Sequence, residues 1–87
     1  MAPRARGMRK PLHTPEHLAF CELMTQARKK AGLTQQALAE RLRRPQSFVA
    51  KYEGGERRLD VIEFVTIARA IGADPVLLLK TLRRRWS

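Results

Sequence analysis

The 87-residue sequence has a single cysteine, Cys21, so no disulfide can form within the chain. We expect this cysteine to be a small core or boundary residue of a helix and not a reactive thiol. Two histidines are present, His13 and His17, and no cluster of cysteines or carboxylates stands beside them to complete a metal site. The sequence therefore predicts exposed histidines, no metal site and no cofactor.

Long apolar segments are also missing. No stretch approaches the roughly 20 apolar residues that a membrane span needs, and no apolar segment follows the basic N-terminus as it would in a signal peptide. A transit peptide would be rich in serine and helical, whereas Pro3 and Pro11 bracket the first segment here. We expect a cytoplasmic protein with no membrane partner.

Acidic residues are few. The chain has 18 lysines and arginines against 8 acidic residues, a net charge of +10 and a pI near 11.3, which indicates a polyanionic partner without separating DNA, RNA and anionic membranes. Four basic residues lie in the first ten positions and four in the last eight, with no acid among them. The central body of the chain has the other ten basic residues and all eight acidic ones, so its net charge is only +2. We expect residues 1–13 to form a flexible basic arm and residues 84–87 a basic tail.

Patterns typical of enzymes are absent. The carboxylates are spread along the chain, and no glycine-rich loop is placed to hold phosphates. A chain of this length forms one domain with a modest core, too small for a buried catalytic cleft and its supporting shell. We expect a binding protein and not an enzyme.

Helical signals fill residues 14–83. Thr14 is positioned to cap a first helix, Asp60 a later one, and Asp74 with Pro75 to open the last. The first helix is expected to bury a stripe made of Leu18, Phe20, Leu23, Met24, Ala27 and Ala31. With connections of two to six residues, the sequence predicts an all-α fold, a compact bundle of about five short helices.

The segment 34–53 predicts two short helices joined by a tight corner. Gly32 ends the preceding helix, Thr34 caps the next, and a small residue, Ala39, permits close approach of the helix that follows. Pro45 interrupts the pattern, so one helix ends before it and another begins near it. Spacing turns three side chains of this second helix inward: Phe48, Val49 and Tyr52.

These residues resemble the helix-turn-helix of the lambdoid phage repressor and Cro family, also called the XRE family. The resemblance rests on the run Leu33, Thr34, Gln35, Ala39, Leu42, Pro45, Gln46, Ser47, Val49, Lys51, Tyr52 and Glu53 and extends from about Leu18 to Leu82. It implies a lambda-repressor-like DNA-binding domain. One departure is Arg43, which stands at the corner where the family usually has glycine, and a left-handed conformation there costs on the order of 1 kcal/mol.

The resemblance implies that the second short helix enters the major groove and reads bases. It places Gln46, Ser47 and Lys51 at the reading positions, with Ala50 near enough to touch a thymine methyl. Glutamine suits the N6 and N7 edge of adenine, lysine the O6 and N7 edge of guanine, and serine either. The alternative is that Gln46 and Ser47 are ordinary first-turn residues of a helix.

The resemblance also implies residues that grip the DNA backbone. Gln35 matches the residue that opens the first short helix and binds a phosphate. Four arginines flank the reading helix and are expected to bind phosphates without reading sequence: Arg43, Arg44, Arg57 and Arg58. Arg28 and Glu53 match a buried structural ion pair of the family. The alternative for the arginines is a solvated run of charge.

The last helix is expected to mediate homodimerisation. Its four consecutive apolar residues, 76–79, cover more than one face, and Trp86 lies near its end. The resemblance implies dimer contacts from this region, here Val76, Leu79 and Trp86. The expected protein is a nucleoid-associated bacterial or phage repressor that binds double-stranded DNA at a pseudo-palindromic operator.

Three alternatives remain open at this stage. Antitoxins of toxin–antitoxin pairs, which would bind a toxin, and controller proteins of restriction-modification systems share this size and fold. A protein-interaction module that holds RNA or membrane through its basic ends is the alternative outside DNA binding, with a surface helix at 76–86. Against a membrane role stand polar residues at the groove-reading positions: Gln35, Gln46, Ser47 and Lys51.

Overall fold

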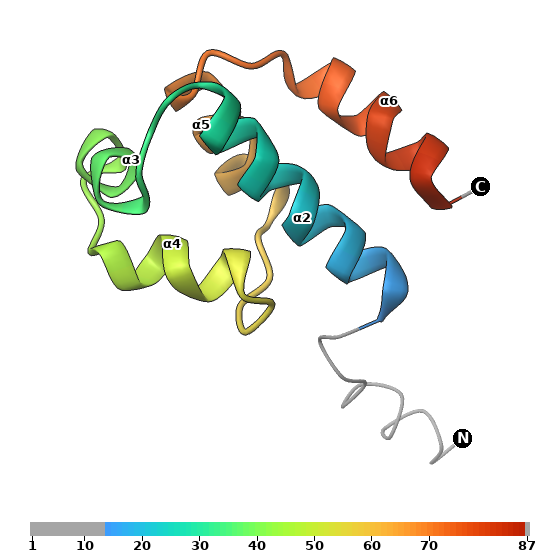
Figure 1. The fold of residues 1–87 in the computed structure, drawn as a ribbon, viewed down its shortest axis with the longest axis horizontal. Helices are drawn as coiled ribbons and strands as arrows, with labels where there is room; N and C mark the ends of the chain where they lie inside the picture. The colour runs from blue at the N-terminus through green and yellow to red at the C-terminus, as the bar shows by residue number, and fades with distance from the viewer. Residues whose placement is uncertain (1–13, 87) are drawn as a thin grey trace.

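The computed structural model describes residues 14–86, which form five α-helices and no strand (Figure 1). They are α2 (Pro15–Lys30), α3 (Gln35–Leu42), α4 (Gln46–Glu53), α5 (Val61–Ala70) and α6 (Pro75–Trp86). This architecture confirms the all-α prediction of about five short helices. The basic arm expected at residues 1–13 lies outside the described residues. The expected tail differs, because α6 runs to Trp86 and residues 84–86 form its last turn.

Helix ends follow local signals in the sequence. The hydroxyl of Thr14 accepts a hydrogen bond from the His17 N–H at 3.1 Å, and that of Thr34 accepts one from the Ala37 N–H at 3.0 Å. Asp60 begins α5 with a capping box, in which its carboxylate accepts from the Glu63 N–H at 2.7 Å. These caps satisfy amides that a helix start leaves without partners. They also set the phase of each helix, which decides which side chains enter the core.

The longest helix, α2, runs through the middle of the molecule (Figure 1). The short helices α3 and α4 meet at a corner on one side of it, and α6 lies along its other side in the opposite direction. The α5 helix contacts both α3 and α6. The core between them consists of Met24, Leu38, Ala39, Phe48, Val49, Tyr52, Phe64, Ile67 and Ile71. Because α4 contributes only one face to this core, its other face is exposed.

Three expectations about α2 were wrong. Ala31, assigned to the core stripe, is instead the exposed residue that caps the C-terminus of α2. Leu18, assigned to the core stripe, is 44% exposed, because the cap at Thr14 turns His17 inward in its place. His17 was expected to be exposed but is buried, with Nε2 3.6 Å from Sγ of Cys21. Cys21 is buried as expected, and burial raises the pKa of its thiol, which keeps it protonated at neutral pH.

Tyr52 is buried in the core, and its hydroxyl has no hydrogen-bond partner among the described residues. We expect Tyr52→Phe to raise the free energy of unfolding by about 1 kcal/mol, because a buried unpaired hydroxyl is lost while the ring remains. Burial also raises the pKa of this phenol well above its usual value of about 10. The raised pKa therefore leaves the stability of the wild type unchanged below pH about 10. Above that pH the wild type loses stability, because the unfolded chain releases the phenol proton that the folded protein retains.

Urea denaturation of both proteins from pH 7 to 11 tests this expectation. The advantage of the phenylalanine variant should grow above pH about 10, because only the wild type then has a phenolate to bury. A variant that is less stable at every pH would show that the hydroxyl makes a favourable contact.

Candidate nucleic-acid interface

The corner between α3 and α4 is closed by backbone hydrogen bonds. Arg43 adopts the left-handed conformation, with φ 58° and ψ 42°. The Arg44 N–H then donates to the Ala39 carbonyl at 3.0 Å, as in a helix end normally built on glycine. Ala39 is fully buried, so its small side chain lets α4 pack directly against α3. Pro45 precedes α4 and provides no side-chain cap.

Arg43→Gly is expected to stabilise the fold by about 1 kcal/mol, because glycine adopts positive φ without the steric cost of a Cβ. If the exposed Arg43 side chain binds a phosphate, the same change should also reduce the slope of log affinity against log salt by about 1. Thermal unfolding and salt titrations of DNA affinity measure the two effects separately. A variant with higher stability and unchanged salt dependence would remove Arg43 from the interface.

One face of α4 points away from the core. Gln46, Ser47 and Lys51 are exposed and Ala50 is half-buried, whereas Val49 on the opposite side is fully buried. Residues 46 and 50, and 47 and 51, are one turn apart, so the four predicted reading positions share a surface. The structure thus brings together the residues assigned to base reading.

A chain of polar contacts joins this surface to the interior. Arg28 donates two hydrogen bonds to the carboxylate of Glu53, from Nε at 2.7 Å and Nη2 at 3.0 Å. Its Nη1 donates to the Leu33 carbonyl at 2.7 Å. Gln35 Nε2 donates to Oε1 of the same carboxylate at 3.0 Å, and Gln46 Nε2 donates to Oε1 of Gln35 at 2.7 Å. The side chain of Gln46 is therefore oriented by residues of α2, α3 and α4.

This orientation suits a bidentate contact. A glutamine amide has two N–H donors and one carbonyl acceptor, and the bond to Gln35 uses one donor. The remaining N–H and the Oε1 of Gln46 form the pair that matches adenine N7 and N6. Gln35, for which phosphate binding stays a prediction, connects Glu53 to Gln46 within the chain.

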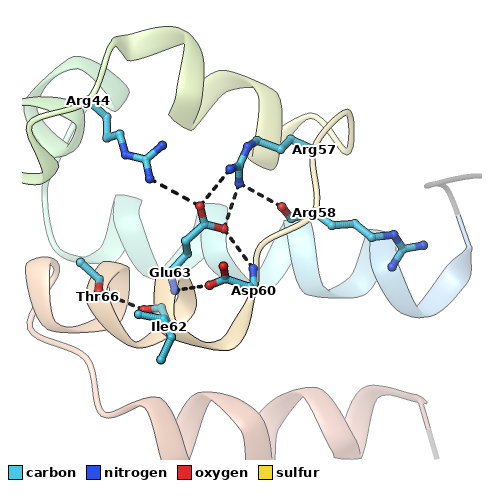
Figure 2. A network of polar contacts seen from close by, with 7 residues as sticks. All are labelled: Arg44, Arg57, Arg58, Asp60, Ile62, Glu63 and Thr66. Carbon is cyan, nitrogen blue, oxygen red and sulfur yellow. Dashed lines mark hydrogen bonds and ion pairs between the residues drawn. The ribbon is translucent and has the colours of Figure 1, made fainter.

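The four arginines of the expected phosphate grip differ in their surroundings. Arg43 and Arg58 are exposed, whereas Arg44 and Arg57 reach toward Glu63 at the start of α5 (Figure 2). Both of these guanidinium groups also lie over the ring of Phe48, with Cζ at 4.2 Å for Arg44 and 4.9 Å for Arg57 from the ring centre. The alternative of a solvated run of charge therefore does not describe Arg44 and Arg57.

Sequence reasoning missed Glu63 and Arg41. The spacing from Asp60 to Glu63 is that of a capping box and would have marked Glu63 as a cap residue, though not as a partner of arginines. Arg41 donates from Nη1 to the Ala70 carbonyl at 2.8 Å and so ties α3 to the end of α5. No local pattern predicts that contact, because the two residues are far apart in the chain.

The helix-turn-helix geometry of this chain is shared with known proteins. A family model described as a helix-turn-helix domain matches residues 19–81. The solved structure of an XRE-family like protein from Pseudomonas syringae pv. tomato str. DC3000 superposes with a TM-score of 0.76 at 53% sequence identity, covering 80% of this chain and 85% of that chain. The chain belongs to the XRE family of helix-turn-helix proteins. It therefore carries a DNA-binding domain of XRE type, as the sequence resemblance implied.

A second solved structure shares the fold at lower sequence identity. A mutant form of the restriction-modification controller protein C.Esp1396I superposes with a TM-score of 0.76 over 84% of this chain and 92% of that chain. Its sequence identity is 18%, so the likeness is one of fold. No curated protein sequence matches the chain.

Other kinds of site find little support in residues 14–86. This part of the XRE-family chain holds no group of three histidines, cysteines or carboxylates that could bind a metal ion. No helix in the same range is long and apolar enough to cross a membrane.

Proposed function

We propose that the protein is a sequence-specific transcriptional regulator that inserts α4 into the major groove of double-stranded DNA. The observation that carries this proposal is the exposed set Gln46, Ser47 and Lys51 on a helix whose first residue is held in place through Gln35. Side chains with donors and acceptors at the N-terminal half of such a helix read base edges. Ala50 adds an apolar contact for a thymine methyl.

Phosphate contacts position the reading helix on the duplex. In this proposal the exposed Arg43 and Arg58 and the half-exposed Arg44 bind phosphates on either side of the groove. The N-terminus of α3 beside Gln35 presents amides to another phosphate. These contacts supply affinity that falls with salt, while α4 supplies sequence preference.

Dimerisation through α6 completes the proposal. Val76 and Leu79 are 57% and 50% exposed, and their three-residue spacing places them beside each other on one face of α6. The last assigned member of this surface, Trp86, ends the helix, and its side chain lies outside the described set. Two copies related by a two-fold axis would read a pseudo-palindromic operator and repress by occupying promoter DNA. The antitoxin, controller and interaction-module alternatives have no separate observation in their favour.

Selection of bound fragments from genomic DNA tests the function directly. The enriched site is then titrated against random duplex at two salt concentrations. A two-fold related site preferred by at least about 10³ supports a dimeric operator-binding regulator. Failure to enrich any site, with affinity that disappears as salt rises, would show that the basic residues bind any polyanion.

Gln46→Ala is expected to reduce discrimination by about 1–3 kcal/mol at one base pair of the operator, because the bidentate contact with that base is lost. Affinity for random duplex should remain close to that of the wild type. Competition titrations with operators altered at single positions measure both quantities. An equal loss on specific and random DNA would remove Gln46 from the reading residues.

A further inference from the structure

Glu63, at the start of α5, contacts two arginines that flank opposite ends of α4 (Figure 2). Arg57, in the loop after α4, donates from Nη1 to Oε1 at 3.0 Å and from Nη2 to Oε2 at 2.9 Å. Arg44, in the corner before α4, places Nη2 3.5 Å from Oε2. One carboxylate on a neighbouring helix therefore contacts both flanks of α4.

The same two arginines are attached to α4 itself. Phe48 is 8% exposed, and both guanidinium groups lie over its ring. The negative face of an aromatic ring attracts a cation at this distance. Arg44 and Arg57 thus connect Phe48 of α4 to Glu63 of α5.

The carboxylate of Glu63 is itself held in place. Its Oε1 accepts a hydrogen bond from the Asp60 N–H at 3.0 Å as part of the capping box. The hydrogen bonds from Arg57 and then from the Asp60 backbone lower the pKa of Glu63 to about 2. Glu63 is consequently ionised at every pH at which the protein would meet DNA.

Arg57 and Arg44 differ in the number and length of the hydrogen bonds that they make within the chain. Arg57 Nη1 also donates to the Arg58 carbonyl at 3.0 Å, so its guanidinium is bonded at three positions inside the chain. The contact of Arg44 with Glu63 is longer, and its side chain is 44% exposed. Arg44 can exchange a weak contact for a phosphate, whereas Arg57 would have to give up three hydrogen bonds.

We propose that Glu63 is a positioning residue of the DNA-binding surface, which fixes both ends of α4 through Arg44 and Arg57. Arg57 acts within the protein, and Arg44 is the member of the pair that turns to a phosphate. This inference rests on the proposed DNA-binding function and replaces the earlier expectation that Arg57 binds the DNA backbone.

Two variants with the same change in net charge test whether Glu63 affects DNA binding by positioning α4 or only by its charge. Glu63→Gln removes one negative charge, and Glu22→Gln, on the exposed surface of α2, removes one away from α4. Both variants should bind random duplex slightly better than the wild type. Only Glu63→Gln should lower the ratio of operator to random affinity, by about tenfold. Equal ratios in the two variants would overturn the positioning role.

Glu63→Asp provides a variant without a charge change. It keeps the carboxylate but shortens the side chain by one methylene, so the bonds to Arg57 and Arg44 can no longer both form. The operator to random ratio should again fall. A ratio equal to that of the wild type would show that only the charge of Glu63 matters.

Salt titrations distinguish the two arginines. Arg44→Met should reduce the slope of log affinity against log salt by about 1, as expected for one lost phosphate contact, and Arg57→Met should leave the slope unchanged. A lower slope in Arg57→Met would overturn the division of roles.

Hydrogen exchange in the absence of DNA tests the same proposal independently. Glu63→Gln should accelerate exchange of the amides in α4 and in residues 54–60, whereas Glu22→Gln should not. Unchanged exchange in Glu63→Gln would refute positioning by Glu63. Failure of the unaltered protein to prefer any DNA site would instead refute the proposed function.

Discussion

Arg28→Met is expected to lower the free energy of unfolding by about 3–5 kcal/mol. The Arg28 and Glu53 side chains are only 8% and 5% exposed, and hydrogen bonds of 2.7 and 3.0 Å join them. Without the guanidinium, the buried Glu53 carboxylate would retain the amide of Gln35 as a partner but no opposite charge beside it. Urea denaturation at neutral pH measures the loss.

Two further variants show whether the loss comes from a stranded charge. Arg28→Met combined with Glu53→Leu should recover most of the stability, because apolar residues of similar size often replace a buried ion pair without cost. Lys30→Met, an exposed change on the same helix, should alter stability by less than about 0.5 kcal/mol. An Arg28→Met variant as stable as Lys30→Met would mean that the pair contributes nothing to folding.

The helices could be predicted from sequence because their boundaries are local. Thr34 caps α3 through an amide three residues away, and Gly32 and Gly72 adopt positive φ directly after helices. Pro45 ends one helix and precedes the next for reasons contained in its own ring. Each of these signals acts within one turn, so it is visible in the order of residues.

Contacts between residues far apart in the chain were harder to predict from the sequence. The pairing of Arg28 with Glu53, 25 positions apart, was anticipated only through the family resemblance, because charge alone offers many possible partners. The contacts of Arg44 and Arg57 with Glu63 depend on the path of the loop before α5, which no spacing rule describes. The placement of Gln35 between Glu53 and Gln46 likewise requires three helices to be in position.

Leu79→Glu is expected to prevent dimerisation and to lower affinity for the operator by about 10²-fold, because one bound copy no longer holds the second near its half-site. Leu79 is 50% exposed on the outer face of α6, so the substitution should leave the folded monomer intact. Analytical ultracentrifugation measures the oligomeric state, and titration with operator DNA measures the affinity.

The matched control is Val61→Glu, which places the same charge at a residue of α5 that is 74% exposed. Both substitutions lower the net charge by one, so both should weaken binding to random duplex equally. Only Leu79→Glu should remove the additional affinity for a two-fold related site. Salt offers a second distinction, because Lys80, Arg83 and Arg84 are exposed beside the apolar part of α6 and would repel their counterparts in the proposed dimer. Added salt should therefore favour association of two copies while it weakens DNA binding, and a dimer that dissociates as salt rises would place the interface elsewhere.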